Sequence, residues 1–272
     1  TSFAGDLQEG INRINAGEYN AGYKLILPLA EQGNSLAQTV LGSMYEQGQG
    51  VTQDYNEAVN WYQNSAEQQN ALGQLYLGKM YYLGRGVLQD YGEAIKWFNL
   101  SAEQGQKDAQ YNLAVMYFHG QGVQQNFSKA QNIYQNLAMQ GHAKARYNLS
   151  LMFFKGKEIQ QNYKEAFKWF KLSAAQGIAV AQYNLGYLYD QGKGVVQDCI
   201  MAFKLYSLSA KQGNGLAQSN LGLMYDLGKG VSQDYKEAVK WFKLSAAHGI
   251  KEGQTNLGTM HEKGHGVVQD YK

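Results

Sequence analysis

The sequence of 272 residues contains one cysteine and one proline, and only 17% of its residues are charged. The single Cys199 excludes an internal disulfide framework but leaves the compartment undecided. A net charge of +2 is too small for nucleic-acid binding through bulk electrostatics. The longest apolar runs, such as residues 25–30, are far shorter than the roughly 18 residues that cross a bilayer. With 44% apolar and 13% aromatic residues, the composition indicates a globular chain.

Glycine is abundant, and its 32 copies would indicate a flexible chain if they were scattered. Instead, the run GQGV at Gly48 recurs with substitutions every 36 residues. Its copies begin at Gly48, Gly84, Gly120, Gly156, Gly192, Gly228 and Gly264. We call positions related by multiples of 36 a column. The columns of Gly33, Gly42, Gly48 and Gly50 hold 24 of the glycines, so most glycines are periodic elements of a repeat.

Each repeat has the apolar spacing of two helices. In the first helix, Ala37, Leu41, Met44 and Tyr45 form one stripe, and Gly48 is expected to end the helix. The second helix is expected to begin after an N-cap residue with Glu three positions later. These pairs are Asp54 with Glu57, Asp90 with Glu93, Asn162 with Glu165 and Asp234 with Glu237. The four tryptophans, Trp61, Trp97, Trp169 and Trp241, share one column of the second helix, which indicates a packing position and no cofactor.

A single hairpin of 36 residues cannot bury both of its faces, so neighbouring hairpins must stack. The small residues of the Gly42 and Ala66 columns allow the helices to approach closely. The sequence therefore predicts an all-α, right-handed α/α superhelical solenoid of about seven 36-residue helix-turn-helix repeats. We expect residues 1–272 to form one continuous domain, because a solenoid escapes the size limit of a single core.

The two ends depart from the repeat. Residues 1–33 are expected to form an N-terminal capping hairpin with a short turn at Ala16 and Gly17, in which Pro28 produces a kink or marks the cap. Six full repeats occupy 34–249, and 250–272 is a truncated final repeat. We therefore expect a fragment of a longer repeat protein, or a domain boundary. The first residues lack the basic and apolar regions of a secretion signal.

Residues 214–249, NGLAQSNLGLMYDLGKGVSQDYKEAVKWFKLSAAHG, resemble the Sel-1-like repeat family, relatives of the tetratricopeptide repeat, and the resemblance covers nearly the whole chain. It implies an α-solenoid that acts as a scaffold or adaptor in protein complexes, as in bacterial secreted, periplasmic and host-interaction proteins. Some bacterial members carry one disulfide per repeat, and this sequence departs from them. A secreted or periplasmic location is favoured by the resemblance alone.

Two motifs have catalytic or ligand-binding interpretations. Residues 261–265, HEKGH, fit the zinc-protease pattern H-E-x-x-H. However, His261 lies in the Tyr45 column and Gly264 is expected to end the helix, so His265 would not share a face with His261. The Gly-x-Gly turns are read as structural rather than phosphate-binding, because they follow a helix and lack a third glycine. Glu158 replaces the second glycine of one turn, which we expect to differ in shape. We predict no enzymatic activity, no cofactor and no metal.

Cys199 follows the predicted N-cap Asp198, a place that lowers a thiol pKa, but no base lies beside it in the sequence, and we read it as incidental.

Positive charge is concentrated late in the chain. The six lysines of a basic ridge on second helices are Lys164, Lys168, Lys171, Lys236, Lys240 and Lys243. A solvated face is the simpler interpretation of this ridge. The alternative is peripheral contact with an anionic membrane surface.

The columns of Thr39, Ser43 and Glu46 lie opposite the apolar stripe of the first helices, on the face that lines the concave surface of related solenoids. In the outer repeats these columns are polar, whereas the middle repeats carry aromatic residues. The predicted contacts for a protein or peptide partner are Lys79, Tyr82, Tyr111, Val115, Phe118, Tyr147, Leu151, Phe154, Tyr183 and Tyr187, with Lys155 near the rim. The alternative is that these side chains pack on one another across repeats. Against it, the Phe118 and Phe154 column accepts carboxylates elsewhere, so we expect their truncation to leave thermal stability nearly unchanged. We expect a monomer.

Overall fold

The computed structural model describes residues 3–156 and 159–267. All of its described regular structure is helical, which confirms the predicted all-α class and the pairing of helices within each repeat. The chain divides into two compact units, residues 1–133 and 134–272. The helices of the first unit are α1 (Phe3–Asn15), α2 (Tyr19–Glu31), α3 (Ser35–Gln47), α4 (Tyr55–Glu67), α5 (Ala71–Leu83), α6 (Tyr91–Glu103) and α7 (Lys107–His119).

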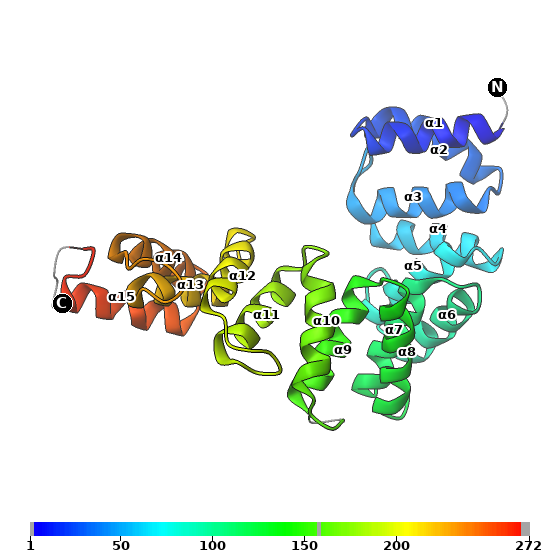
Figure 1. Ribbon diagram of the computed structural model, residues 1–272. Coiled ribbons are helices and arrows are strands. Elements are labelled where there is room, and N and C mark those ends of the chain that lie inside the picture. Colours follow the sequence, from blue (N-terminus) through cyan, green and yellow to red (C-terminus); the bar gives the residue numbers. More distant parts are fainter. Residues whose placement is uncertain (1–2, 157–158, 268–272) are drawn as a thin grey trace. The chain divides into compact units, whose positions relative to one another are not determined.

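The unit boundary falls inside α8 (Phe127–Met139). The second unit continues with α9 (Ala143–Lys155), α10 (Tyr163–Ala174), α11 (Ala179–Gln191), α12 (Cys199–Lys211), α13 (Gly215–Leu227), α14 (Tyr235–Ala247) and α15 (Lys251–Lys263). Within each unit, successive helices pack side by side along the chain, as α3 and α4 do in Figure 1. The odd-numbered helices from α3 are the predicted first helices, and the even-numbered helices are the second.

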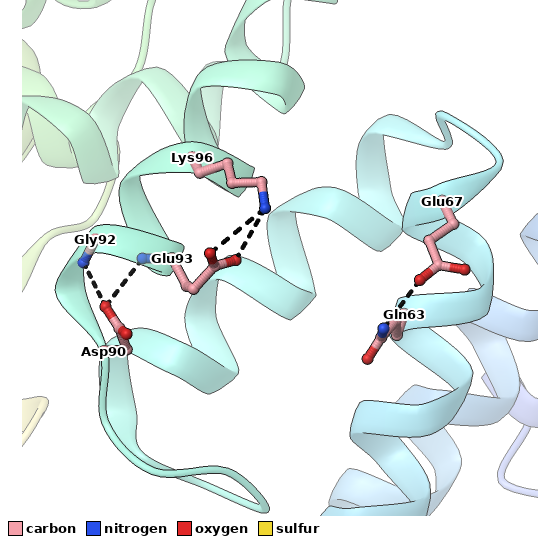
Figure 2. A network of polar contacts seen from close by, with 6 residues as sticks. All are labelled: Gln63, Glu67, Asp90, Gly92, Glu93 and Lys96. Atoms are coloured by element: carbon pink, nitrogen blue, oxygen red, sulfur yellow. Dashed lines mark hydrogen bonds and ion pairs between the residues drawn. The ribbon is translucent and has the colours of Figure 1, made fainter.

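The predicted residues that begin and end the helices are confirmed, as α3 and α6 show. Gly48 adopts the left-handed conformation, with φ of 67°, and ends α3. Asp90 caps α6 by accepting hydrogen bonds from the backbone N–H groups of Gly92 and Glu93 at 2.8 and 3.0 Å (Figure 2). Glu93 does not bond back to the Asp90 N–H, because that group already donates to the Tyr81 carbonyl oxygen. Instead Glu93 pairs with Lys96 on the solvent side of α6.

The second glycine of each turn packs against the preceding repeat. A Cβ atom on Gly86 would lie 2.2 Å from the carbonyl oxygen of Tyr55, at the start of α4. The same close approach recurs between Gly194 and Tyr163 and between Gly230 and Cys199. Both a positive φ and this contact therefore require glycine in the Gly50 column. The predicted departure at Glu158 lies outside the described residues.

The two helices of a repeat lie close together, as the columns of small residues predict. A Cβ atom on Gly42 would lie 2.7 Å from the Tyr62 ring, so α3 and α4 approach closely only because residue 42 has no side chain. The two helices of one repeat are also joined by polar contacts that recur along the chain. Ser65 donates to the Ser35 carbonyl oxygen at 2.7 Å, and Gln68 donates to Gln38 Oε1 at 2.8 Å. Because Ser65 and Gln38 are buried, these contacts fix the register between the two helices.

One placement of the sequence analysis is wrong. Thr39 was assigned to the open polar face of its helix, but its exposed fraction is 3%. Its hydroxyl lies 2.7 Å from the Ser65 hydroxyl on α4 and also bonds to the Ser35 carbonyl oxygen. A first helix in a stack is covered from two sides, by its own hairpin partner and by the neighbouring repeats. The Thr39 column is consequently more buried than the single-helix periodicity indicates.

Candidate functional site

The ten predicted contact residues are all half-buried, neither core nor fully exposed. Five lie on α5 and α7 of the first unit, namely Lys79, Tyr82, Tyr111, Val115 and Phe118. The other five lie on α9 and α11 of the second unit, namely Tyr147, Leu151, Phe154, Tyr183 and Tyr187. The prediction thus corresponds to one surface in each unit.

The residues of α9 and α11 form an aromatic cluster. The Phe154 ring centroid lies 5.7 Å from Tyr163, 6.1 Å from Phe170 and 5.9 Å from Tyr187, each at a steep edge-to-face angle. Phe170 is fully buried, whereas Tyr187 belongs to the next repeat. Phe154 therefore connects the core of its own hairpin to the surface of the following one. We call Tyr147, Leu151, Phe154, Tyr183 and Tyr187 the α9–α11 aromatic face.

Two further tyrosines of this face rest on the buried core. Tyr147 lies 6.1 Å from Phe170, and Tyr183 lies 5.8 Å from Tyr206, measured between ring centroids. Burial raises the pKa of both Tyr147 and Tyr183 above the ordinary value. Their phenol groups therefore remain neutral at physiological pH. They provide flat apolar surface with a polar hydroxyl, the type of side chain enriched at protein interfaces.

Lys193 borders this face on the turn after α11. Its Nζ atom lies 3.0 Å from the Tyr187 hydroxyl and 4.9 Å from the Tyr187 ring centroid. The hydrogen bond with Tyr187 raises the pKa of Lys193, which therefore stays protonated. The same ammonium group also lies 5.5 Å from the Tyr163 ring. A fixed cation thus stands beside the aromatic side chains.

The side chains of the surface on α5 and α7 also contact neighbouring residues of their own unit. The Tyr82 hydroxyl donates to Gln121 Oε1 at 3.0 Å, and its ring lies 5.5 Å from Tyr91. Phe118 packs edge to face on Phe127 at 5.3 Å. Lys79 Nζ lies 4.9 Å from the Tyr76 ring centroid. These contacts pack the aromatic residues against neighbouring helices and leave part of each side chain exposed.

Carboxylates occupy the Phe154 column in four other repeats, and Glu46 and Asp190 among them contact polar side chains. Glu46 Oε2 accepts a 2.7 Å hydrogen bond from Tyr62, and Glu46 also approaches Arg85 at 3.9 Å. Asp190 forms an ion pair with Lys229 at 2.5 Å, which raises the pKa of Lys229. The column is therefore half-buried in every repeat except the last, where Glu262 is exposed, and it accepts either a carboxylate or an aromatic ring.

Hollows flank the first helices in each unit. In the first unit, a hollow of about 190 Å³ is lined by α1, α3 and α5, including Ile14, Val40 and Tyr76. In the second unit, a hollow of about 260 Å³ is lined by Tyr187, Asp190, Tyr206, Asn220 and Lys229, among others. The second hollow continues the α9–α11 aromatic face at Tyr187. These hollows do not follow from the sequence, because they depend on the spacing between helices.

The six lysines of the predicted basic ridge are all exposed. Two of them pair with glutamates of their own helices, since Lys168 lies 3.6 Å from Glu165 and Lys240 lies 3.1 Å from Glu237. Lys240 also lies over the Trp241 ring, at 5.7 Å from its centroid. All six belong to α10 and α14, both in the second unit.

The H-E-x-x-H match has a structural explanation. His265 lies beyond the left-handed Gly264 and stacks on the Tyr235 ring at 4.2 Å, with an angle of 24° between the planes. Its column holds Arg85 and Lys193 in other repeats, and these also lie over the aromatic residue that begins the preceding second helix. No group of three potential metal-binding side chains occurs among the described residues. No described helix has the length and apolarity needed to cross a bilayer.

A family model described as Sel1 repeat matches 35–70, 71–106, 107–142, 143–178, 179–214, 215–250 and 251–272. The chain belongs to the Sel1 repeat family. Its single cysteine means that this Sel1 repeat chain has no disulfide in each repeat. In a comparison with curated proteins, none matched the chain.

Solved structures of similar sequence share the Sel1 repeat fold. The chain is similar to c5321, a protective antigen present in uropathogenic Escherichia coli strains, with 33% identity and a TM-score of 0.85. That match covers 99% of this chain and 59% of the antigen chain, so this sequence spans somewhat more than half of that relative. A Sel1 repeat protein from Oxalobacter formigenes matches with 32% identity and a TM-score of 0.83, over 89% of this chain and 99% of the other.

A more distant structure shows the fold alone. The immunity protein PA5088 from Pseudomonas aeruginosa is 17% identical, with a TM-score of 0.52, over 80% of this chain and 82% of the other. These comparisons establish a helical-repeat scaffold of the Sel1 type.

Proposed function

We propose that this Sel1 repeat chain is a non-enzymatic scaffold that binds a protein or peptide partner through the α9–α11 aromatic face. The observation that carries the proposal is the half-buried cluster around Phe154, whose ring touches Tyr163, Phe170 and Tyr187 while part of it stays exposed. Aromatic side chains held rigidly at a surface lose little conformational entropy on binding and often supply most of the binding energy.

The composition of the face indicates the partner chemistry. Tyr147, Tyr183 and Tyr187 present both rings and hydroxyl groups, and Lys193 adds one fixed positive charge at the border. A partner segment with apolar side chains and backbone carbonyl groups fits this combination, because tyrosine hydroxyls and an ammonium group donate hydrogen bonds. The equivalent aromatic residues of α5 and α7, including Tyr82, Tyr111 and Phe118, are proposed as a second contact area of the same kind.

The contacts of Phe154 change one expectation from the sequence. Truncation of Phe118 and Phe154 was expected to leave thermal stability nearly unchanged. Because both rings pack on neighbouring side chains and are half-buried, we now expect each Phe→Ala change to cost about 1 to 2 kcal/mol, less than the roughly 3 to 5 kcal/mol of a fully buried phenylalanine. The binding test therefore needs a variant that keeps the fold intact.

Other repeats of the chain supply such a variant. Tyr147→Thr, Leu151→Thr and Phe154→Glu place on α9 the side chains that Thr255, Thr259 and Glu262 have in the same columns. Phe170→Tyr is added so that the new glutamate can accept a hydrogen bond, as Glu46 does from Tyr62. Each introduced residue already occurs in the same column of another repeat. We therefore expect the variant to retain its helical circular dichroism spectrum.

The test begins with peptides selected from a random displayed library against the wild-type protein. We expect the selected peptides to bind the four-residue variant at least tenfold more weakly, a change of about 1.4 kcal/mol. The matched control is Leu100→Asn on α6 of the first unit, which lies outside the proposed contact areas and should leave peptide affinity unchanged. Equal affinity for the wild type and the α9 variant would contradict the proposal.

A further inference from the structure

The second helices of the second unit carry an exposed leucine in each repeat. Leu172 on α10, Leu208 on α12 and Leu244 on α14 occupy one column, with exposed fractions of 38%, 50% and 42%. The same column holds Asn64 on α4 and Asn136 on α8, so the position accepts a polar side chain. Packing within the repeat therefore does not require leucine here, and an exposed apolar column of this kind indicates an interaction surface.

Lysines flank this leucine column. Lys204 and Lys211 lie four residues before and three residues after Leu208 on α12, and both are exposed. Neither forms an ion pair with any residue that the structure describes. In the first unit, the Lys204 column holds Asn60, and the Lys211 column holds Glu67. On α6 the same two columns hold Lys96, which pairs with Glu93, and Glu103, so among the described second helices only α12 has lysine in both columns.

A hollow of about 470 Å³ opens beside Leu208. Its lining comes from α12, α13 and α14 and consists of Phe203, Lys204, Ser207, Leu208, Lys211, Leu221, Tyr225 and Trp241. The Trp241 Nε1 atom is buried and donates to no hydrogen-bond acceptor in the described part of the chain. Most of the lining residues are thus apolar or aromatic, and the two lysines among them are exposed and form no ion pair with a described residue.

We propose that this surface, defined by Lys204, Leu208, Lys211 and Trp241, binds an acidic amphipathic helix of a protein partner. A bulky apolar side chain of that helix fills the hollow, and carboxylates on either side pair with the two lysines. Lys204 and Lys211 are seven residues apart, or about 10 Å along α12. Acidic residues at positions i and i+7, with an apolar residue midway, present the complementary spacing on one helix face.

The shape of the surface favours a helix over a lipid bilayer. Binding to a bilayer surface places protruding apolar side chains among the headgroups. Here Phe203, Leu221 and Trp241 line a depression, so the partner has to supply the protruding group. Charge complementarity then requires acidic residues around that group, because Lys204 and Lys211 belong to the lining of the hollow itself. This site lies on the second helices and is independent of the α9–α11 aromatic face.

The experiment uses a synthetic helical peptide as the probe. It carries glutamates at i and i+7 and a tryptophan at i+4 on one face, with alanine and glutamine elsewhere. The matched control peptide has lysine in place of both glutamates. We expect the acidic peptide to bind the full chain by isothermal titration calorimetry and fluorescence anisotropy at physiological salt, and the lysine peptide to bind at least tenfold more weakly.

Substitutions taken from the other repeats test the location. Lys204→Asn, Leu208→Asn and Lys211→Glu introduce residues found in the same columns at Asn60, Asn64 and Glu67. The combined variant should keep its helical spectrum and weaken the acidic peptide at least tenfold. Leu100→Asn, in the same column of the first unit, should leave the affinity unchanged. Leu208→Asn alone separates the apolar contact from simple charge attraction.

Three results would overturn the proposal. The first is that the acidic peptide does not bind the wild-type protein. The second is that it binds Leu208→Asn as tightly as wild type, which would indicate attraction to lysines without insertion into the hollow. The third is that the chain binds phosphatidylcholine vesicles only when they contain phosphatidylserine and loses that binding in the combined variant, which would assign the surface to an anionic membrane.

Discussion

The Tyr62 hydroxyl on α4 donates a 2.7 Å hydrogen bond to Glu46 on α3, and this bond joins the two helices of one hairpin. Tyr206 on α12 occupies the same column, but the carboxylate opposite it is Asp190, one methylene shorter. The Tyr206 hydroxyl is buried and has no hydrogen-bond partner among the described residues. Two chemically similar tyrosines thus differ in whether their hydroxyl contributes to stability.

The first prediction compares Tyr62→Phe with Tyr206→Phe. We expect Tyr62→Phe to lower the free energy of unfolding by about 1 to 2 kcal/mol, because it removes a hydrogen bond to a charged acceptor. We expect Tyr206→Phe to change it by less than about 0.5 kcal/mol, because no partner loses a bond. Urea denaturation followed by circular dichroism at neutral pH measures both. Equal losses in the two variants would contradict the assigned contacts.

The second prediction concerns alkaline pH. Burial, and then the nearby carboxylate, raises the pKa of both Tyr62 and Tyr206 above the ordinary tyrosine value. In the unfolded chain these tyrosines lose their protons near pH 10, whereas the folded chain retains them, so the folded state binds more protons. Stability therefore falls as the pH rises above about 10, and it is fully present below that value. Stability measured from about pH 8 to 11 should fall less steeply for Tyr206→Phe than for wild type. Parallel curves would exclude a contribution from Tyr206.

Much of the fold follows from the sequence because the repeat multiplies each weak signal. Gly48 alone would be an ambiguous helix end, but its column predicts the same end in every repeat, and the left-handed φ confirms it at each described copy. The burial of Thr39 did not follow, because periodicity within one helix carries no information about the helices that cover it. The contact between Lys193 and Tyr187 was also missed, since it depends on how a turn folds back over its own helix.

The third prediction compares two glycines. At one of them an added side chain meets only an unfavourable backbone conformation, and at the other it also meets steric overlap. Gly86 and Gly105 both have positive φ, at 69° and 84°. A Cβ atom at Gly105 meets open space, whereas one at Gly86 overlaps the Tyr55 carbonyl oxygen. We expect Gly105→Ala to cost about 1 to 2 kcal/mol through the unfavourable left-handed conformation. Gly86→Ala should cost at least about 2 kcal/mol more, since the backbone has to move. Thermal unfolding of the two variants provides the measurement, and similar midpoints would refute the close approach.

The fourth prediction concerns metal binding. Because His265 stacks on Tyr235 and lies beyond the end of α15, we expect no zinc site shared with His261. His265→Ala should leave the zinc content of the purified protein unchanged after incubation with zinc and desalting, as measured by atomic absorption. A stoichiometric metal in the wild type that disappears in His265→Ala would reverse this interpretation. A small loss of thermal stability is expected in either case, because the ring contact is removed.

The contact between the second turn glycine and the preceding repeat is made with backbone atoms, and it persists whether the residue opposite is Tyr55, Tyr163 or Cys199. Because this contact involves main-chain atoms, it does not depend on which side chain stands opposite the glycine. Whole 36-residue segments can consequently be duplicated, deleted or exchanged in the gene without loss of this backbone contact. The side chains on the outer faces are then free to diverge repeat by repeat. Binding specificity can therefore change while this backbone contact is retained.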